Sequence, residues 1–534
     1  MSTEELDTSA YQGQDHPLLS NSGKPFTVVL MTIYSVENAG LRYISAALQR
    51  EGIECHIVFL RDWVNNALEM PSDNEFEIAI DIARRKGADL IGIGFMSSLL
   101  SMARELTARL KTTLPNTPIC WGGIHPTSVP EECINEVEYL CVGEGEMAMI
   151  DLSRALAAEE LTTAIPNIWA NKAGVIYENK PRPLIQDLDW LPWPDTADDN
   201  KYYIEKERVT VEEPWKRSAE YRVYFSRGCP YNCSYCYVSI LREVYDEKGK
   251  RYYRARSVDH IMGELEYAMK TFPKIARIKV DDDTSFAFGK PWMEEFLVQY
   301  PKRVDLPFEC MLIPPMLRPQ MLKRLKEVGL VRVQTGIESG SSKESMEIHN
   351  RAPGNVNILK FAEANKELKL NIVYDLIVDN PHATEEMKLE TAEFLLELPG
   401  PYDIYFYSLN YFPGTALTKS SLAAGTLDPD LIEGRNNKAW HQFRVSMDWP
   451  RDNEERFYLA IFCLASKSFV PKAFIRKLLD NREYWKKNVE PLHYLAWSAN
   501  TVKMFWVAMR YFRNGELTWF KMRQYGNLTK MISQ

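Results

Sequence analysis

The sequence predicts an α/β protein with two consecutive segments of alternating strands and helices, followed by a helical C-terminal region. Short apolar runs alternate with stretches of helical periodicity over residues 25–151, as in a doubly wound parallel sheet. The alternation begins again after residue 216 and ends near residue 426. Residues 427–534 combine helical periodicity with many aromatic side chains, which indicates a separate helical domain.

The composition is that of an ordinary soluble protein. A chain of 534 residues is long enough for about two to four domains, each with its own core. The hydrophobic fraction is 45% and the charged fraction 26%, both typical values. A net charge of −9 argues against a nucleic-acid partner, which would favour a basic surface. Because neither a signal-peptide pattern nor an apolar run of about 18 residues is present, we expect a cytoplasmic enzyme.

The first segment follows a polar stretch, residues 1–24, which has no periodicity and is predicted to be a mobile tail. Buried strands are then expected at residues 26–31, 54–59, 90–95, 118–121 and 139–142, the last being the final strand of this sheet. Helices are expected at residues 40–51, 74–86, 99–111 and 130–135, with a loop at 122–126.

Small residues gather where these strands end. Ligands of doubly wound sheets bind beyond the carboxyl ends of the strands. Glycine there lets a bulky ligand approach the backbone, and helix N-termini offer unpaired N–H groups. Tight strand-to-helix turns would produce the same pattern, so these residues alone do not decide between a ligand site and plain turns. The residues concerned are Gly40, Ser97, Ser98, Gly122, Gly123 and Gly143.

Residues 152–215 form a connection rich in Pro, Trp and Asp. Its repeated prolines exclude a long helix and indicate an extended crossing between domains. A small hairpin is expected to turn at Ala173 and Gly174.

The second alternating segment, residues 216–426, places an apolar strand at 221–225 directly before a cysteine-rich loop. Further strands are expected at residues 275–280, 307–312, 330–335, 371–378 and 403–409. Helices are expected at residues 258–271, 291–300, 319–328, 356–368 and 385–397.

The cysteine-rich loop spaces Cys229, Cys233 and Cys236 as C-x3-C-x2-C. Thiolates are the usual ligands of iron–sulfur clusters, and three ligands for a four-iron cube leave one iron open to a small chelating molecule. A structural zinc site is the alternative, but it needs a fourth ligand, and the nearest downstream histidine is the distant His260. The other six cysteines lie singly among apolar residues and are expected to be buried thiols in a reducing compartment. They are Cys55, Cys120, Cys133, Cys141, Cys310 and Cys463.

This loop, with Tyr235 just before the third cysteine and an apolar strand before the first, resembles the radical SAM superfamily. The resemblance implies a [4Fe-4S] cluster held by Cys229, Cys233 and Cys236. Its open iron would bind the amino and carboxylate groups of S-adenosylmethionine (SAM), which an electron then splits into a 5′-deoxyadenosyl radical. The resemblance also implies an electron donor such as flavodoxin or ferredoxin. The fold it implies is a partial (β/α)6 barrel with its active-site groups at the carboxyl ends of the strands.

Placed before such a motif, the segment 25–151 resembles the cobalamin-binding domain of the cobalamin-dependent radical SAM enzymes. The stretches that carry the resemblance are residues 37–43, 92–98, 122–127 and 143–146. The cobalamin-binding residues that it implies are Glu37, Gly40, Leu41, Ser97, Ser98, Gly122, Gly123, His125, Thr127, Gly143, Glu144 and Gly145.

One departure concerns the lower face of the cobalt. Cobalamin domains of the methionine synthase type carry Asp-x-His-x-x-Gly, whose histidine ligates the metal. If Gly40 is the glycine of that pattern, Ser35 and Glu37 occupy the other two positions and this loop offers no imidazole. The resemblance therefore implies cobalamin with its base tail displaced and no protein histidine on cobalt, which eases reduction to the cob(I) form. His125 could serve as a ligand instead, but a role near the cofactor tail or in loop packing is favoured.

The barrel segment carries residues that the same resemblance assigns to SAM. Asp281 and Asp282 end the second strand and match an acidic stretch that contacts the SAM amino group, although a solvated acidic turn is the alternative. Glu338 and Ser339, in a Gly-Ile-Glu-Ser-Gly stretch, would lie near the ribose and carboxylate of SAM. Arg351 matches an arginine that pairs with the carboxylate, as a guanidinium can do with two hydrogen bonds; a surface arginine is the plainer interpretation. Cys310 could donate a hydrogen atom to a radical, but a small buried residue is favoured.

The resemblance implies that the helical region, residues 427–534, holds the substrate specificity. Its last part, residues 503–530, is basic. It contains a single acid, Glu516, and six cations: Lys503, Arg510, Arg513, Lys521, Arg523 and Lys530. A basic, aromatic helix can rest on an anionic membrane surface. Packing on the barrel with snorkelling cations is favoured, and a lipid substrate stays open.

The function that the resemblance implies is methylation of an unactivated carbon of a small-molecule, lipid or peptide substrate. One SAM would supply the methyl of methylcobalamin, and a second would give the 5′-deoxyadenosyl radical that abstracts hydrogen from the substrate. The alternative uses the same cofactors for an oxidative cyclisation or ring rearrangement without methyl transfer, as in anaerobic porphyrin cyclases. A non-catalytic cobalamin sensor is a third hypothesis, which the three intact cysteines disfavour.

Overall fold

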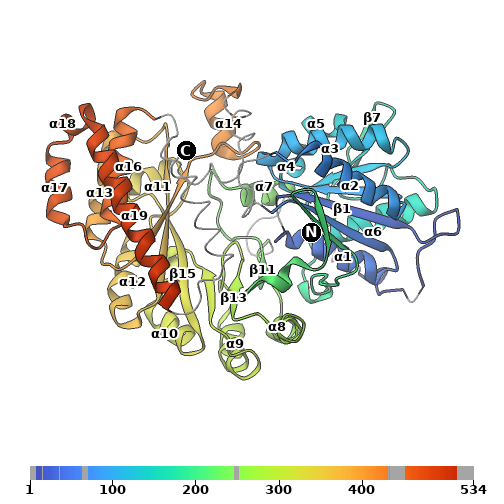
Figure 1. Cartoon of the computed structure of the whole chain (residues 1–534), viewed down its shortest axis with the longest axis horizontal. Helices are drawn as coiled ribbons and strands as arrows, with labels where there is room; N and C mark the ends of the chain where they lie inside the picture. Colours follow the sequence, from blue (N-terminus) through green and yellow to red (C-terminus); the bar gives the residue numbers. More distant parts are fainter. Residues whose placement is uncertain are drawn as a thin grey trace, which may run out of the picture. The chain divides into compact units, whose positions relative to one another are not determined.

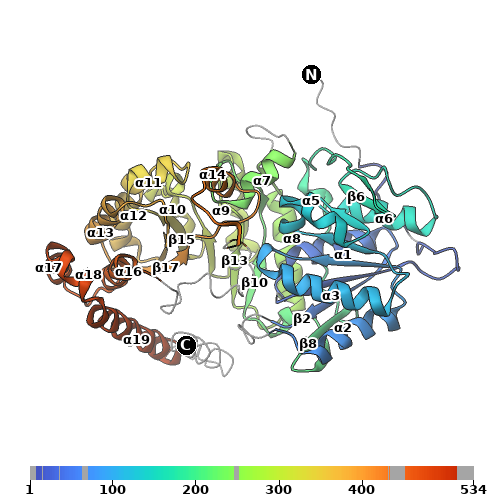
Figure 2. The same ribbon diagram turned by 90° about the horizontal axis from the view of Figure 1, so that it is seen from above.

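The computed structural model describes residues 8–14, 16–34, 36–62, 70–245, 252–430, 432 and 451–513. The chain divides into two compact units (Figures 1 and 2). The first unit consists of Met1–Tyr221, Phe225–Ile275 and Asn410–Trp440, and the second of Arg222–Tyr224, Ala276–Leu409 and His441–Gln534.

The first unit is built on a nine-stranded sheet with the order β7-β6-β5-β4-β3-β1-β2-β8-β9. Its central strands are β1 (Thr27–Ile33), β2 (Glu54–Leu60), β3 (Leu90–Gly94), β4 (Ile119–Gly122) and β5 (Tyr139–Cys141), all parallel. The helices that follow them are α1 (Ala39–Arg50), α2 (Asp73–Lys86), α3 (Leu100–Thr113) and α6 (Glu146–Ala157). Helices α1 and α6 pack together on one face of the sheet and α2 and α3 on the other, so the predicted doubly wound sheet is confirmed (Figure 1).

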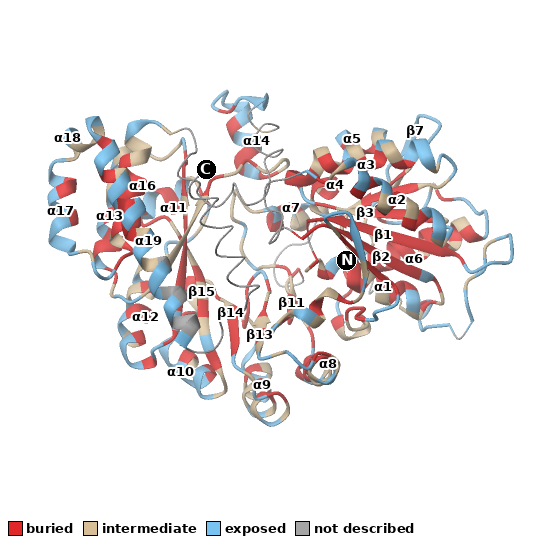
Figure 3. Ribbon diagram, viewed as in Figure 1, coloured by how far each residue is buried: buried red, intermediate tan, exposed pale blue. Residues whose placement is uncertain are grey.

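Local sequence explains where these elements begin and end. Every residue of β1 is buried (Figure 3), as expected for a strand covered on both faces. Helix α2 starts with a capping box, in which the Glu75 N–H donates to Ser72 Oγ and the Ser72 N–H donates to the Glu75 carboxylate. It ends at Gly87, which adopts φ +63° and so satisfies the last carbonyls without steric cost.

The expected extended crossing instead adds four strands to the sheet, and the prediction that the strand at 139–142 is the last one is wrong. Strand β6 (Ile168–Lys172) pairs antiparallel with β5, and β8 (Lys201–Glu205) pairs parallel with β2. The partners β7 (Val175–Tyr177) and β9 (Arg208–Val211) complete two hairpins. The predicted turn at Ala173 and Gly174 is confirmed, both with positive φ. The prolines exclude a long helix but allow short strands between them. The edge strands β2 and β5 of the sheet provide hydrogen-bonding partners for β8 and β6.

A second difference lies between β4 and β5. The expected loop at 122–126 turns at once into a short helix, α4 (Ile124–Ser128), which is followed by α5 (Pro130–Cys133). Gly123 makes this possible because its φ of +94° lets the chain reverse within one residue.

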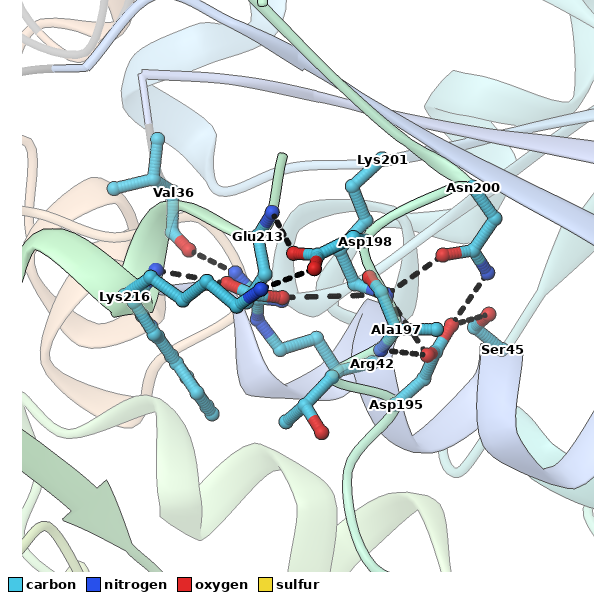
Figure 4. Close-up of polar contacts among 12 residues, drawn as sticks. Val36, Arg42, Ser45, Asp195, Ala197, Asp198, Asn200, Lys201, Glu213 and Lys216 are labelled. Carbon is cyan, nitrogen blue, oxygen red and sulfur yellow. Dashed lines mark hydrogen bonds and ion pairs between the residues drawn. The ribbon is translucent and has the colours of Figure 1, made fainter. Parts of the chain in front are cut away.

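Four buried charges fasten the added strands to the rest of the sheet (Figure 4). The Arg42 guanidinium pairs with Glu213, and both side chains are fully buried. Lys201, also fully buried, lies 2.8 Å from Asp195, which accepts a 2.6 Å hydrogen bond from Ser45 on α1. Arg42 also donates a 2.7 Å hydrogen bond to the Val36 carbonyl, in the loop before α1. The network therefore fixes both the added strands and that loop.

The first unit also contains the cysteine-rich loop. It lies between the two-stranded ribbon of β11 (Ser226–Arg227) and β12 (Arg254–Ala255) and the helix α7 (Tyr237–Val244). Helix α8 (Val258–Thr271) has the predicted bounds, and α14 (Ala416–Ala423) belongs to the same unit.

The second unit contains the main part of a six-stranded sheet with the order β10-β13-β14-β15-β16-β17, which confirms the predicted partial barrel. The strands are β10 (Glu220–Val223), β13 (Arg277–Val280), β14 (Phe308–Met311), β15 (Leu330–Glu338), β16 (Asn371–Val378) and β17 (Asp403–Ser408). The helices between them are α9 (Lys290–Arg303), α10 (Pro319–Glu327), α11 (Ser342–Glu347), α12 (Asn355–Leu368) and α13 (Glu385–Glu397). Helix α11 was not predicted because it is only six residues long.

In the part of the second unit that the structure describes after residue 450, the helices are α16 (Asn453–Ala465), α17 (Lys472–Asp480), α18 (Arg482–Lys487) and α19 (Val489–Arg513). Helix α16 packs against α13 and α19. Within the described ranges, no helix is both long and apolar enough to cross a bilayer. Ser35 and residues 514–530, and with them most of the expected basic stretch, lie outside the described residues.

We expect Glu213→Gln to destabilise the first unit strongly, because it leaves the buried Arg42 without an anion. Removing one partner of a buried ion pair costs about 3–5 kcal/mol. Urea unfolding of the cofactor-free protein measures the change. The matched control is Glu136→Gln, since the half-exposed pair between Arg104 on α3 and Glu136, in the same unit, is worth about 0–1 kcal/mol. Equal losses in the two variants would contradict the prediction.

Candidate functional site

Three loops converge at the carboxyl edge of the first unit's sheet, after β3, β4 and β5. Ser97 and Ser98 form a short 3-10 turn after β3 and are buried. The Ser97 hydroxyl lies 3.0 Å from His125 Nδ1, on α4. Thr127, one helical turn away from Ile124, accepts a 3.1 Å hydrogen bond from the Gly143 N–H after β5. The structure thus brings together the predicted residues of all three loops.

Two glycines at this edge leave no room for a side chain. A Cβ on Gly123 would lie 2.7 Å from the Phe95 carbonyl oxygen, and one on Gly143 would lie 2.2 Å from the Tyr245 hydroxyl. Both have positive φ. Gly122, which ends β4, is less crowded, because a Cβ there would meet only Cys141 at an ordinary 3.6 Å.

The predicted residues near α1 lie beside this edge but play local roles. Asn38 caps α1 by accepting a 3.1 Å hydrogen bond from the Leu41 N–H. Gly40 is in the first turn, and Leu41 is buried against Gly94 of β3. Glu37 lies in the preceding loop, half-buried. Gly145 caps α6, and a Cβ there would press on Ile44 of α1 at 2.9 Å, so small size at this position serves packing between α1 and α6.

His125 is neutral at physiological pH. Burial lowers its pKa to about 4, with a further lowering by Arg104. The ring packs against Phe95 with centroids 5.8 Å apart, and the side chain is 3% exposed. Its Nδ1 faces Ser97, whereas Nε2 has no hydrogen-bond partner in the described part of the chain. A buried polar atom in this state normally finds a ligand or water.

Two cavities adjoin these loops within the first unit. The larger, of about 980 Å³, is lined by Ser97, His125 and Thr127 together with residues of α5, α7 and α14. The smaller, of about 190 Å³, is lined by Gly123, Thr127, Gly143, Glu144 and Tyr245 among others. The residues fit a corrinoid with a long tail. Glycine backbone lies at this edge, and the larger cavity is spacious. Among the described residues, neither His125 Nε2 nor the buried Ser98 Oγ has a hydrogen-bond partner.

Four charged residues connect this edge to the cysteine-rich loop. Arg254 lies 2.6 Å from Glu144, and Arg227 lies 2.5 Å from Glu146 and 3.4 Å from Glu144. Burial would raise the pKa of Glu144, but Arg254 and Arg227 outweigh this effect and lower the pKa to about 2. Glu144 is therefore a carboxylate committed to the two arginines. We call Glu144, Glu146, Arg227 and Arg254 the four-charge cluster.

The cluster adjoins the cysteines through the ribbon. Arg227 of β11 stands opposite Arg254 of β12, and Gly228 follows at once with φ +86°. A Cβ on Gly228 would meet the Tyr252 carbonyl oxygen at 2.5 Å. Only glycine therefore allows the chain to leave the ribbon in the direction of Cys229.

Cys229, Cys233 and Cys236 are half-buried, and the other six cysteines are buried as predicted. Tyr235, between the last two of the three, is also half-buried. Arg242 on α7 donates a 3.1 Å hydrogen bond to the Tyr231 carbonyl, and the Leu417 N–H donates to the Ser234 carbonyl at 2.9 Å. The loop is thus held at its middle. Among the described residues, no three His, Cys, Asp or Glu side chains are gathered as a preformed metal site. The three thiols lie on one loop.

In the second unit, the acidic stretch after β13 separates into three environments. Asp281 pairs with Lys279 at 3.0 Å and with Arg222 at 3.2 Å. Burial would raise the pKa of Asp281, but these cations lower it overall. Asp282 is 1% exposed, whereas Asp283 is exposed to solvent. A wholly solvated acidic turn is therefore not what the chain forms.

Glu338 and Arg351 form an ion pair beyond β15. Arg351 Nη1 lies 2.8 Å from Glu338 Oε1, and Arg351 Nη2 donates a 2.9 Å hydrogen bond to the Gly336 carbonyl. Glu338 has φ +61°, an unusual backbone conformation for a non-glycine residue that is typical of functional sites. A Cβ on Gly336 would lie 2.0 Å from Glu338 Oε1, so the glycine makes room for this pair.

Ser339 faces into the unit instead. Its hydroxyl donates a 2.6 Å hydrogen bond to Glu344 and lies 3.1 Å from the Thr391 hydroxyl. Asn380, after β16, donates to the same Glu344 at 2.7 Å. Burial raises the pKa of Glu344. Ser339 therefore fixes the loop after β15. Cys310, on β14 of the same sheet, is a buried thiol, and burial raises its pKa.

Sequence reasoning missed Arg227, Arg254 and Tyr245. Tyr245 accepts a 2.6 Å hydrogen bond from the Glu144 N–H. A signal was present for Arg227, since Gly143-Glu-Gly-Glu146 offers two carboxylates and Arg227 lies two residues before the first cysteine of the motif. The pairing itself spans more than 80 residues of sequence and could not be read from either stretch.

Comparison with known proteins assigns both segments. Residues 27–153 match the B12 binding domain, and residues 223–395 match the Radical SAM superfamily. An uncharacterized methyltransferase from Pyrococcus horikoshii is 26% identical over 398 residues, which cover 73% of this chain and 79% of that protein. The anaerobic magnesium-protoporphyrin IX monomethyl ester cyclase of Rubrivivax gelatinosus is 23% identical over 440 residues, covering 73% of this chain and 72% of the cyclase.

A solved structure shares the architecture. The cobalamin-dependent S-adenosylmethionine radical enzyme OxsB, with aqua-cobalamin and S-adenosylmethionine bound, aligns with a TM-score of 0.64 at 14% identity, covering 95% of this chain and 83% of OxsB. The agreement supports the fold of both segments. The chain thus combines a B12 binding domain with a domain of the Radical SAM superfamily, and its cofactors are cobalamin, SAM and a [4Fe-4S] cluster.

Proposed function

We propose that this enzyme methylates a carbon atom of a small-molecule substrate. The observation that carries the proposal is the four-charge cluster, which ties the ribbon before Cys229 to the carboxyl edge of the B12-binding sheet within one unit. Methyl transfer needs both cofactors, and a chain that joins their loops through partly buried ion pairs is suited to use them together. The methyltransferase of P. horikoshii, similar over most of its length, supports the same reaction.

When bound, the cofactors supply the methyl group and the radical chemistry; the chain supplies ligands and charge. In the first unit, we assign iron ligation to Cys229, Cys233 and Cys236, with Tyr235 beside the cluster, and corrinoid binding to the loops that carry Ser97, Ser98, Gly123, His125 and Thr127. An external reductant such as flavodoxin or ferredoxin would supply electrons.

In the second unit, we assign SAM binding to the Glu338–Arg351 pair and to Asp282. Arg351 holds its guanidinium at a strand end with a fork geometry suited to a carboxylate. After β13, we assign the SAM amino group to the carboxyl of Asp282, which is 1% exposed.

The second candidate is an oxidative cyclisation or ring rearrangement with the same cofactors and no methyl transfer. The similarity to the R. gelatinosus cyclase covers as large a share of this chain as the similarity to the methyltransferase. The substrate class, whether lipid, peptide or another small molecule, does not distinguish the two.

Methyl-deuterated SAM separates these reactions. We expect the anaerobically reconstituted enzyme, supplied with a reductant and an extract containing its substrate, to give a product heavier by a deuterated methyl group together with 5′-deoxyadenosine. Mass spectrometry measures both. Continued formation of 5′-deoxyadenosine with no labelled product would overturn the methylation proposal and favour cyclisation.

Gly123→Ala should reduce corrinoid uptake, because the new methyl group would press on the Phe95 carbonyl oxygen at 2.7 Å. A non-glycine residue at positive φ costs about 1–2 kcal/mol by itself. Gly174→Ala controls for this cost, since Gly174 has φ +88° but nothing within 4 Å of its Cβ position. Corrin absorbance after gel filtration with hydroxocobalamin is the readout. Uptake that is equal in the two variants would contradict the assignment of this edge.

Arg351→Gln should weaken SAM binding by about tenfold or more, since a hydrogen bond to a charged group is worth about 1.5–3 kcal/mol. Arg351→Lys keeps the charge but loses the fork, and it should fall between wild type and Arg351→Gln. The control is Arg324→Gln in the same unit, which removes a half-exposed pair with Glu294. Equilibrium dialysis with labelled SAM measures all three variants. Unchanged affinity in Arg351→Gln would refute the assignment.

A further inference from the structure

Helix α19 exposes a row of large apolar side chains. Tyr494, Phe505 and Trp506 are 65%, 65% and 67% exposed, and Val502 is 45% exposed. Tyr484 on the neighbouring α18 is 61% exposed. The outer faces of α17 and α18 are exposed as well (Figure 3). Such a concentration of exposed aromatic groups marks an interaction surface.

The opposite side of α19 is also apolar. Val489, Leu492, Ala496 and Ala499 are buried and follow one another at helical spacing on the side that packs against α16. A helix that is apolar on both sides is normally covered on both sides. Packing with snorkelling cations accounts for the buried side only, because the exposed side presents aromatic rings instead of the stems of charged residues.

The charge of this region distinguishes between possible partners for the exposed side of α19. Residues 472–534 contain 12 lysines and arginines against four aspartates and glutamates, a formal charge of +8, in a chain whose net charge is −9. Arg476, Lys477 and Lys487, on α17 and α18, are exposed, and the described residues form no ion pair with them. A second copy would bring two cationic surfaces together, which is unfavourable. An anionic partner is favoured.

The described helices cannot cross a membrane, but α19 is 25 residues long and combines exposed aromatic rings with nearby cations. Aromatic side chains with a polar edge favour the boundary between water and lipid, and cations favour an anionic leaflet. We propose that the surface formed by α17, α18 and α19 docks on an anionic phospholipid bilayer, parallel to its plane. This property is independent of the reaction proposed above.

The test is flotation of the full-length protein with lipid vesicles, without cofactors or substrate. We expect binding to vesicles of phosphatidylcholine mixed with phosphatidylglycerol, weaker binding in high salt, and little binding to phosphatidylcholine alone. The charge variant Arg476→Gln/Lys477→Gln should lower the partition coefficient by about fivefold for each cation removed.

The apolar variant Phe505→Ser/Trp506→Ser should lower the partition coefficient by about tenfold or more. Its matched control is Leu161→Ser/Val356→Ser, which removes two apolar side chains that are 73% and 64% exposed elsewhere on the protein. Circular dichroism, which reports the helix content of the whole chain, verifies that each variant is folded, and hydroxocobalamin uptake verifies that the first unit is intact.

Three results would overturn the proposal. The first is absence of wild-type binding to the anionic vesicles. The second is equal binding to neutral and anionic vesicles, which would exclude charge as a determinant. The third is concentration-dependent dimerisation, seen by analytical ultracentrifugation and lost in Phe505→Ser/Trp506→Ser, without vesicle binding, which would assign the surface to a second copy of the chain.

Discussion

The four-charge cluster is the interaction on which the arrangement of the first unit depends. Arg227 and Arg254 stand on the ribbon that leads into the cysteine-rich loop, and Glu144 and Glu146 follow β5 of the sheet. The two arginines and the two carboxylates neutralise each other's charge. An unpaired charge in this partly buried position would be costly. The pairing fixes the start of the cysteine-rich loop relative to the carboxyl edge of the sheet.

A second constraint acts on the opposite half of the same sheet. Arg42, Lys201, Asp195 and Glu213 hold the added strands β8 and β9 against α1 (Figure 4). Arg42 also donates a hydrogen bond to the Val36 carbonyl. Val36 lies in the loop that carries the cobalt-ligating histidine in cobalamin domains of the methionine synthase type. Glu37 in this loop is not a histidine. Arg42, five residues further along on α1, holds the Val36 carbonyl in place.

The polar residues at the end of β15 divide between an ion pair and an internal network. Glu338, the last residue of β15, pairs with Arg351, which lies between α11 and α12, whereas Ser339, Glu344 and Thr391 form the internal network. The adjacent glutamate and serine of one sequence stretch thus have different partners: Glu338, whose φ is +61°, pairs with Arg351, and Ser339 donates a hydrogen bond to Glu344.

The sequence by itself determined the alternation of strands and helices in both segments, the glycines at strand ends and the three-cysteine loop, because periodicity, φ requirements and ligand spacing are local properties. It also indicated the cofactors, since the motifs around Cys229 and Gly143 are short. Only the tertiary structure decided that residues 168–211 join the sheet, that Glu144 pairs with Arg254 110 residues away, and that α19 leaves Trp506 exposed. These depend on which edges and charges become neighbours after folding, and local sequence does not encode a neighbour that is distant along the chain.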